Sequence, residues 1–132
     1  MNKIIKYGLV ILRDGKFLIN RKHGTKLFLM PGGKVENNET VEECLTREIR
    51  EEHDVELVKD SIKYLMDIES PAVNEPNTML FMKVYIGEII GEPKVSSEIE
   101  EQVWFGKDDD QSILSPAIKN KILPELIKKN II

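Results

Sequence analysis

Apolar residues gather in two runs near the start of the chain, residues 3–13 (KIIKYGLVILR) and 16–21 (KFLINR). Both runs are rich in β-branched and aliphatic residues, which favour strands. Asp14 and Gly15 stand between them, and an Asp-Gly pair suits a two-residue hairpin turn because both positions take positive φ. The pattern therefore predicts a β-hairpin over residues 3–21.

Strand-like runs also occupy the second half of the chain, at residues 56–68, 78–90 and 98–105. The last stretch, residues 115–129, predicts a closing helix. We expect this helix to be kinked or broken near Pro124, because proline lacks the backbone N–H that an α-helix uses.

The middle of the chain carries a helical pattern. Asn37 and Asn38 are good N-cap residues and acidic residues follow them, so we expect a helix over residues 39–53. The Pro-Gly-Gly sequence at 31–33 is expected to end the preceding apolar piece rather than continue a strand. Asp54 stands where a left-handed residue would close the helix. Strands on both sides of a central helix predict an α/β layered domain with a mixed sheet.

Two glutamates interrupt the apolar side of this helix. Val41, Leu45 and Ile49 form an apolar stripe at helical spacing, and Glu48 and Glu52 fall at or near its Val41 edge. Carboxylates at such positions lose solvation and need a partner. A divalent cation that prefers oxygen ligands, Mg²⁺ or Mn²⁺, supplies one. The alternative is a solvated acidic face, which is the usual role of a run of glutamates.

A longer pattern surrounds these glutamates. The segment from Gly33 to Val55 reads GKVENNETVEECLTREIREEHDV. It fills eight of the nine fixed positions in the pattern Gly, five residues, Glu, seven residues, Arg-Glu-apolar-any-Glu-Glu-any-Gly-apolar, and only Asp54 departs from it. This pattern is the Nudix box, and the segment resembles the catalytic element of Nudix hydrolases. These MutT-like enzymes cleave nucleoside diphosphates linked to another group. The resemblance implies an α/β/α sandwich with a mixed β-sheet.

The resemblance also implies a metal-dependent mechanism. Glu48 and Glu52 would be the main ligands of a Mg²⁺ (or Mn²⁺) cofactor, and Glu51 would share that work. A backbone carbonyl at Gly32 or Gly33 would complete the ligand set. The cation would neutralise the charge of a pyrophosphate and orient a bound water for attack at phosphorus.

Further roles follow from the same resemblance. Glu39 and Arg47 would brace the loop against the helix, although an ordinary surface ion pair is the alternative. The general base is Glu48 or a carboxylate just before Trp104. The later candidates are Glu98, Glu100 and Glu101, of which Glu101 enters our set of catalytic residues. Charged residues on an exposed strand edge are the alternative for that cluster.

Two positions before the helix are candidates for substrate contact. Arg21, at the end of the second predicted strand, suits a substrate phosphate, and Phe28 lies at the entrance to the glycine turn. An exposed basic strand end is the alternative for Arg21, and a core position is the alternative for Phe28. We expect His23 and His53 to be exposed to solvent and Trp104 to belong to the core.

Composition narrows the setting. The chain has 132 residues and a net charge of −4, which predicts one domain over 1–132 and argues against nucleic acid as a partner. Cys44 is the only cysteine, so no internal disulfide forms and a reducing, cytoplasmic location is expected. The N-terminal apolar run is too short for a signal sequence or a membrane span. A monomer or a homodimer is expected.

Three functions compete at this point. The first is metal-dependent hydrolysis of a nucleoside diphosphate linked to another moiety, with a (d)NTP-type pyrophosphohydrolase ahead of an ADP-ribose or nucleotide-sugar pyrophosphatase. The second is a non-catalytic nucleotide-binding module of the same family. The third is an interaction domain with an acidic helix, for which the box would be a coincidence.

Overall fold

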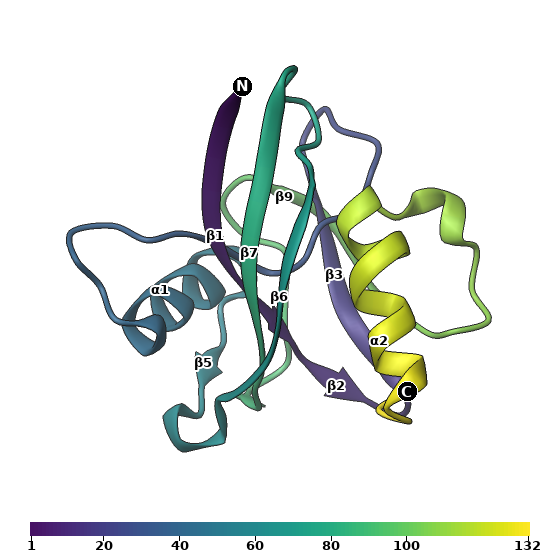
Figure 1. The fold of residues 1–132 in the computed structure, drawn as a ribbon. Coiled ribbons are helices and arrows are strands. Elements are labelled where there is room, and N and C mark those ends of the chain that lie inside the picture. Colours follow the sequence, from purple (N-terminus) through teal and green to yellow (C-terminus); the bar gives the residue numbers. More distant parts are fainter.

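Two β-sheets form the centre of the structure, with a helix on either side of them (Figure 1). The computed structural model describes residues 1–132. The larger sheet has the strand order β4-β1-β7-β6, at Gly32–Lys34, Asn2–Val10, Thr78–Ile86 and Lys63–Pro71. The smaller sheet has the order β2-β3-β9, at Leu12–Arg13, Lys16–Lys22 and Ile99–Phe105. A third, two-stranded pair joins β5 (Glu56–Leu57) to β8 (Ile89–Ile90).

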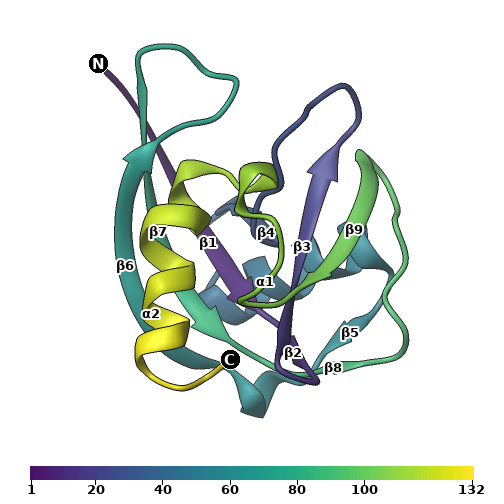
Figure 2. The ribbon, with the colours of Figure 1, turned by 90° about the vertical axis from the view of Figure 1, so that its right-hand side faces the viewer.

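The larger sheet is mixed, as the sequence predicts. Strands β1 and β7 run parallel, whereas β4 pairs with β1 and β6 pairs with β7 in antiparallel fashion. Figure 2 shows α2 (Leu123–Lys128) in front of this sheet and α1 (Val41–His53) behind it. The layered α/β/α arrangement is therefore confirmed.

Several strand boundaries differ from the prediction. The hairpin turn at Asp14 and Gly15 is confirmed, with φ of 52° and 75°. The run 56–68 is not one strand, because a 3₁₀ turn at Lys59–Ser61 separates β5 from β6. The run 78–90 likewise divides into β7 and β8.

The glycine turn was predicted wrongly. Instead of ending a strand, Gly32 and Gly33 belong to β4 and pair with β1. Gly32 has a φ of 133°, and a Cβ there would lie 2.1 Å from the carbonyl oxygen of Tyr7. Glycine is therefore required at position 32 for this close strand pairing.

Helix α1 begins two residues later than predicted. Thr40, not Asn37 or Asn38, is the N-cap, and its hydroxyl accepts a bond from the backbone N–H of Glu43. The Glu43 carboxylate accepts a bond from the Thr40 N–H in return, so the two residues form a capping box. The two asparagines instead take positive φ in the preceding loop. Asp54 closes the helix with a φ of 53°, as predicted.

The C-terminal helix is not broken at Pro124. Residues 116–128 are helical without a gap, and a π-helical turn at Ile118–Ile122 precedes α2. Pro124 lies inside this continuous segment, directly after the π-helical turn, an irregularity that lets the helix continue past a residue without an N–H. Neither α1 nor α2 has the length and apolar composition that a membrane-crossing helix needs.

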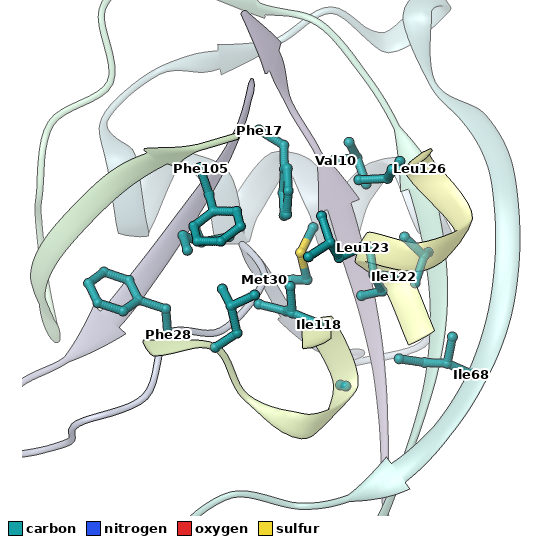
Figure 3. Packing of buried hydrophobic residues seen from close by; sticks show 14 of the residues in the cluster. Val10, Phe17, Phe28, Met30, Ile68, Phe105, Ile118, Ile122, Leu123 and Leu126 are labelled. Atoms are coloured by element: carbon teal, nitrogen blue, oxygen red, sulfur yellow. The ribbon is translucent and has the colours of Figure 1, made fainter. Parts of the chain in front are cut away.

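Two hydrophobic clusters fix the helices. The larger one packs the C-terminal helix against both sheets, and Figure 3 shows Phe17, Phe105 and Ile118 within it. The smaller one holds α1 through Leu45 and Ile49, both fully buried. This second cluster fixes the rotation of α1 about its axis and thereby the direction of its glutamates.

Candidate metal and substrate site

Glu52 is the most deeply buried acid at the site, with 9% of its surface exposed. Its Oε1 accepts a hydrogen bond of 3.0 Å from the backbone N–H of Gly32. Burial raises the pKa of Glu52 to about 8, against the opposing effect of that bond. At neutral pH, a carboxyl group buried in this way ionises fully only if a positive charge lies nearby.

Glu48 lies one helical turn before Glu52 and faces the same glycines. Its Oε1 accepts a bond of 2.7 Å from Nη1 of Arg47, and its side chain is 16% exposed. A Cβ on Gly33 would lie 2.5 Å from the Glu48 carboxyl carbon, so only glycine leaves room for this carboxylate. Burial raises the pKa of Glu48, and the Arg47 bond opposes the rise.

Arg47 also binds Glu39 in a two-pronged ion pair. The Nε–Oε2 and Nη2–Oε1 distances are 2.8 Å and 2.9 Å. Arg47 Nη2 also donates to the carbonyl oxygen of Lys34, and Glu39 accepts from the backbone N–H of Glu36. The bonds from Arg47 hold the pKa of Glu39 at about 2. These contacts connect β4 and the loop after it to α1.

The third predicted ligand stands apart. Glu51 is 53% exposed, and its nearest charged partner is Arg47, 3.7 Å away. No three His, Cys, Asp or Glu side chains come together closely enough to hold a metal ion. The structure thus brings together Glu48 and Glu52 beside Gly32 and Gly33, and leaves Glu51 on the flank. Two partly desolvated carboxylates beside a glycine-lined strand still fit a divalent cation, which would supply the positive charge they lack.

The two carboxylates open into a cavity of about 260 Å³, which we call the carboxylate chamber. Three lysines share it with them, so the wall offers cationic groups next to the acids. Its lining side chains include Lys6, Asn20, Lys22, Lys34, Glu36, Glu48, Glu52, Glu98 and Ser115. Burial and the nearby Lys22 lower the pKa of Lys6.

A second cavity of about 220 Å³ adjoins the first, and we call it the loop chamber. Six residues line both chambers: Lys6, Lys22, Leu29, Leu80, Ser115 and Ala117. The remaining wall comes from Ile4, Thr25 and residues 71–75. Residues from two loops, 22–28 and 70–77, therefore both line this chamber.

Arg21 and Glu101 bind each other. Arg21 Nη2 lies 2.9 Å from Glu101 Oε1, and Nη1 lies 3.0 Å from Glu100 Oε1. Arg21 Nη1 also donates to the carbonyl oxygen of Thr25. None of Arg21, Glu100 and Glu101 lines either chamber, whereas Glu98 lines the carboxylate chamber. Of the candidates for general base, Glu48 and Glu98 therefore lie at the cavity wall.

Phe28 is 4% exposed and belongs to the larger hydrophobic cluster, as Figure 3 shows. It lines neither chamber, so the structure places Phe28 in the core, and its predicted contact with a substrate gains no support from either cavity. The guanidinium of Arg21 lies 5.9 Å from its ring centre. His23 is exposed, as predicted, and Trp104 packs at the edge of the smaller cluster.

His53 was predicted wrongly, because it is fully buried rather than exposed. Its Nδ1 lies 2.8 Å from Gln102 Oε1, and its Nε2 lies 2.9 Å from Asn20 Nδ2. Gln102 Nε2 donates to the carbonyl of Pro93, so Gln102 Oε1 is the acceptor and His53 Nδ1 carries the proton. Burial lowers the pKa of His53, which favours this neutral form.

This chain of bonds fixes Asn20, a residue that the sequence analysis did not single out. Nδ2 of Asn20 donates to Nε2 of His53. The amide oxygen of Asn20 is therefore the polar atom that remains available to the carboxylate chamber, which Asn20 lines. His53 is 33 residues from Asn20 and 49 residues from Gln102 in sequence, so no local pattern reveals these contacts. A buried polar residue in an otherwise apolar strand, Asn20 in KFLINR, is the only sequence signal.

Comparison with known proteins agrees with this geometry. Residues 5–126 match the model of the NUDIX domain. The chain belongs to the Nudix family.

Individual relatives carry different names. An ADP-ribose pyrophosphatase of Methanocaldococcus jannaschii is 32% identical over 100 residues, which are 73% of this chain and 57% of that protein. The chain thus spans little more than half the length of this relative. A MutT NUDIX hydrolase of Burkholderia pseudomallei is 28% identical, with a TM-score of 0.74 over 89% of this chain and 93% of that structure. A MutT protein of Methanosarcina mazei, 20% identical, shares the fold with a TM-score of 0.78 over 98% of this chain and 96% of that structure.

Proposed function

We propose that this protein is a divalent-metal-dependent hydrolase that cleaves the pyrophosphate linkage of a nucleoside diphosphate linked to another moiety. The observation that carries the proposal is the placement of Glu48 and Glu52 beside Gly32 and Gly33, at the wall of a cavity. Membership of the Nudix family supports it. A (d)NTP is the leading substrate class.

In this proposal, Glu48, Glu52 and the Gly33 backbone hold Mg²⁺ or Mn²⁺, and Glu51 assists from the flank. The bound cation would neutralise phosphate charge and activate water. Lys6 and Lys22, which line both chambers, would hold phosphate oxygens between them. Arg47 would keep Glu48 and the loop after β4 in register with the helix.

The general base in this proposal is Glu48 or Glu98. Both carboxylates line the carboxylate chamber, where a water between the cation and the phosphorus would lie. Glu101 would act as the general base only after its side chain moved, because its Oε1 is bound to Arg21 in this structure.

A second candidate substrate is ADP-ribose or another nucleotide sugar. The observation that favours it is the similarity to the archaeal ADP-ribose pyrophosphatase. The choice between the two substrates depends on what enters the loop chamber.

A substrate panel tests the proposal. Nucleoside triphosphates, ADP-ribose and nucleotide sugars would be incubated with Mg²⁺ or Mn²⁺, and release of monophosphate, pyrophosphate and phosphate measured. We expect one class to be hydrolysed with a clear preference. Glu52→Gln should abolish that activity, whereas Glu42→Gln, at an exposed position of the same helix, should retain it. Full activity in Glu52→Gln would show that the metal assignment is wrong.

A further inference from the structure

Asn20 is a buried amide at the wall of the carboxylate chamber. Only 2% of its surface is exposed, and it follows three buried apolar residues in β3. It lines the carboxylate chamber but not the loop chamber. Its N–H donates to the carbonyl of Leu29, and its carbonyl accepts from the Leu29 N–H. The main chain of Asn20 therefore holds its place in the fold without help from the side chain.

A chain of three hydrogen bonds fixes the direction of this amide. The carbonyl oxygen of Pro93 can only accept, so the amide nitrogen of Gln102 donates to it over 2.8 Å. Gln102 Oε1 then accepts from Nδ1 of His53, and His53 Nε2 accepts from Nδ2 of Asn20, over 2.8 Å and 2.9 Å. Each bond leaves one arrangement for the next. Nδ2 of Asn20 therefore faces His53, and Oδ1 points away from it.

The amide oxygen of Asn20 has no partner in the protein and is open to the chamber. The side-chain bond of Asn20 is made by Nδ2, and no bond ends on Oδ1. The buried side-chain atoms that lack both a partner and accessible surface are the hydroxyls of Thr46 and Ser115. Oδ1 of Asn20 is not one of them, so it keeps surface that the chamber can reach. A donor inside the chamber would stabilise this acceptor.

Water is the donor that the proposed function brings to this place. The oxygens of an ionised pyrophosphate only accept hydrogen bonds, and so do those of ionised Glu48 and Glu52. The ammonium of Lys22 lies 3.9 Å from Glu98 Oε2 and makes no bond to Asn20. A water molecule has two O–H groups, so it can donate one to Asn20 Oδ1 and the other to a carboxylate of the chamber.

We propose that Asn20 orients the water that attacks phosphorus, and that His53 and Gln102 are positioning residues that hold its amide in direction. This proposal rests on the function proposed above, because it takes hydrolysis of a pyrophosphate as the reaction. The water oxygen forms the new bond to phosphorus, and the bond from phosphorus to the bridging oxygen breaks, with its electron pair leaving on that oxygen. One proton of the water passes to the general base, Glu48 or Glu98. The other stays on the water oxygen and is held by Asn20, which takes no proton itself and contributes by alignment.

The test compares Asn20→Ala with a matched control, Val84→Ala. Val84 is fully buried in the larger hydrophobic cluster and lines neither chamber, so its truncation lowers stability without changing the site. For Asn20→Ala we expect kcat on the preferred substrate to fall about 10- to 100-fold, because the water loses its alignment. KM should stay within about threefold, since the amide binds water and not the substrate. Val84→Ala, assayed where it is folded, should keep both constants within about twofold, and a purely structural role would give Asn20→Ala the same result.

Two kinetic results would overturn the role of Asn20. One is a kcat of Asn20→Ala within about twofold of the wild type. The other is a raised KM with kcat unchanged, which would make Asn20 a substrate-binding residue. Gln102→Leu keeps the amide oxygen but removes the acceptor that fixes His53, so it should lower kcat by a smaller factor than Asn20→Ala. An unchanged kcat in Gln102→Leu would overturn the positioning role of Gln102 and His53.

A crystal structure of the metal-free wild type gives a readout that needs neither activity nor a folded variant. At a resolution that shows ordered water, we expect a water within about 3 Å of Asn20 Oδ1 that also bonds to a carboxylate of the chamber. A protein group in that place, such as Lys22 Nζ, would overturn the proposal. The lack of ordered water at Oδ1 would overturn it as well.

The two measurements together keep this proposal apart from the proposed function. Hydrolysis by the wild type and by Asn20→Ala at equal kcat would support the activity and overturn the role of Asn20. No hydrolysis of any pyrophosphate substrate by the wild type, with an ordered water on Oδ1, would refute the activity. It would also refute the attacking role of that water, which would then be a structural one.

Discussion

The buried acid Glu52 makes the stability of the metal-free protein depend on pH in a definite direction. Its pKa is about 8 in the folded protein, against an ordinary value of 4.5. Between these values the folded protein retains the proton while the unfolded chain has released it. The unfolded state then binds fewer protons, so the free energy of unfolding falls as pH rises from 4.5 to 8.

The magnitude follows from the same comparison. Each pH unit in that interval removes about 1.4 kcal/mol, so the full interval gives a loss on the order of 5 kcal/mol from this carboxyl alone. Glu52→Gln carries no titrating proton, and its amide oxygen can still accept the bond from the Gly32 N–H. We therefore expect the metal-free variant to match the wild type near pH 5 and to be more stable by several kcal/mol near pH 8.

Urea unfolding in EDTA at pH 5, 6, 7 and 8 measures this difference. Glu42→Gln on the exposed side of α1 is the control and should follow the wild type at every pH. Adding Mg²⁺ at pH 8 should stabilise the wild type but not Glu52→Gln, because a ligand that binds only the folded state raises its stability. Parallel pH profiles for the wild type and Glu52→Gln would refute the argument that burial keeps this carboxyl protonated.

Three more outcomes follow from the site. Gly33→Ala should lower kcat/KM by about a hundredfold or more, because a Cβ 2.5 Å from the Glu48 carboxyl carbon displaces that carboxylate; activity equal to the wild type would contradict this. His53→Leu removes a partner from the buried amide of Asn20 and from the half-buried amide of Gln102, and should destabilise the protein by about 2–4 kcal/mol in urea unfolding, whereas His23→Leu at an exposed position should change it little. Burial raises the pKa of Cys44 to about 11, so iodoacetamide should modify it slowly at pH 8 in the native protein and at least about tenfold faster in urea.

The parts of the site that depend on local spacing could be predicted from the sequence. The apolar stripe of α1 fixes which side of the helix faces the sheets, so the direction of Glu48 and Glu52 follows from their positions relative to Leu45 and Ile49. The positive φ of Asp54 follows from its place at the helix end. Glu51, in contrast, lies on the flank of this group, because its position is about 60° further round the helix from Glu48, away from the apolar stripe, and its side chain is 53% exposed.

The parts that depend on tertiary contact could not be predicted in the same way. Gly32 and Gly33 form a strand only because β1 offers a partner whose backbone they can approach closely. His53 is buried because Asn20 and Gln102, on different strands, satisfy both ring nitrogens. Ser115 directly precedes the helical segment 116–128, where a serine is ordinarily a cap, but its hydroxyl has no partner, and no sequence pattern predicts this.

The two chambers differ in the kind of structure that builds them, and this difference bears on how the family diversifies. The carboxylates stand on a helix that is capped at both ends and anchored by a buried cluster. The far wall of the loop chamber comes from Thr25 and residues 71–75, in connections between strands. Connections accept insertions and replacements that a packed helix does not. Under the proposed function, changes in these connections would alter substrate preference without displacing Glu48 and Glu52.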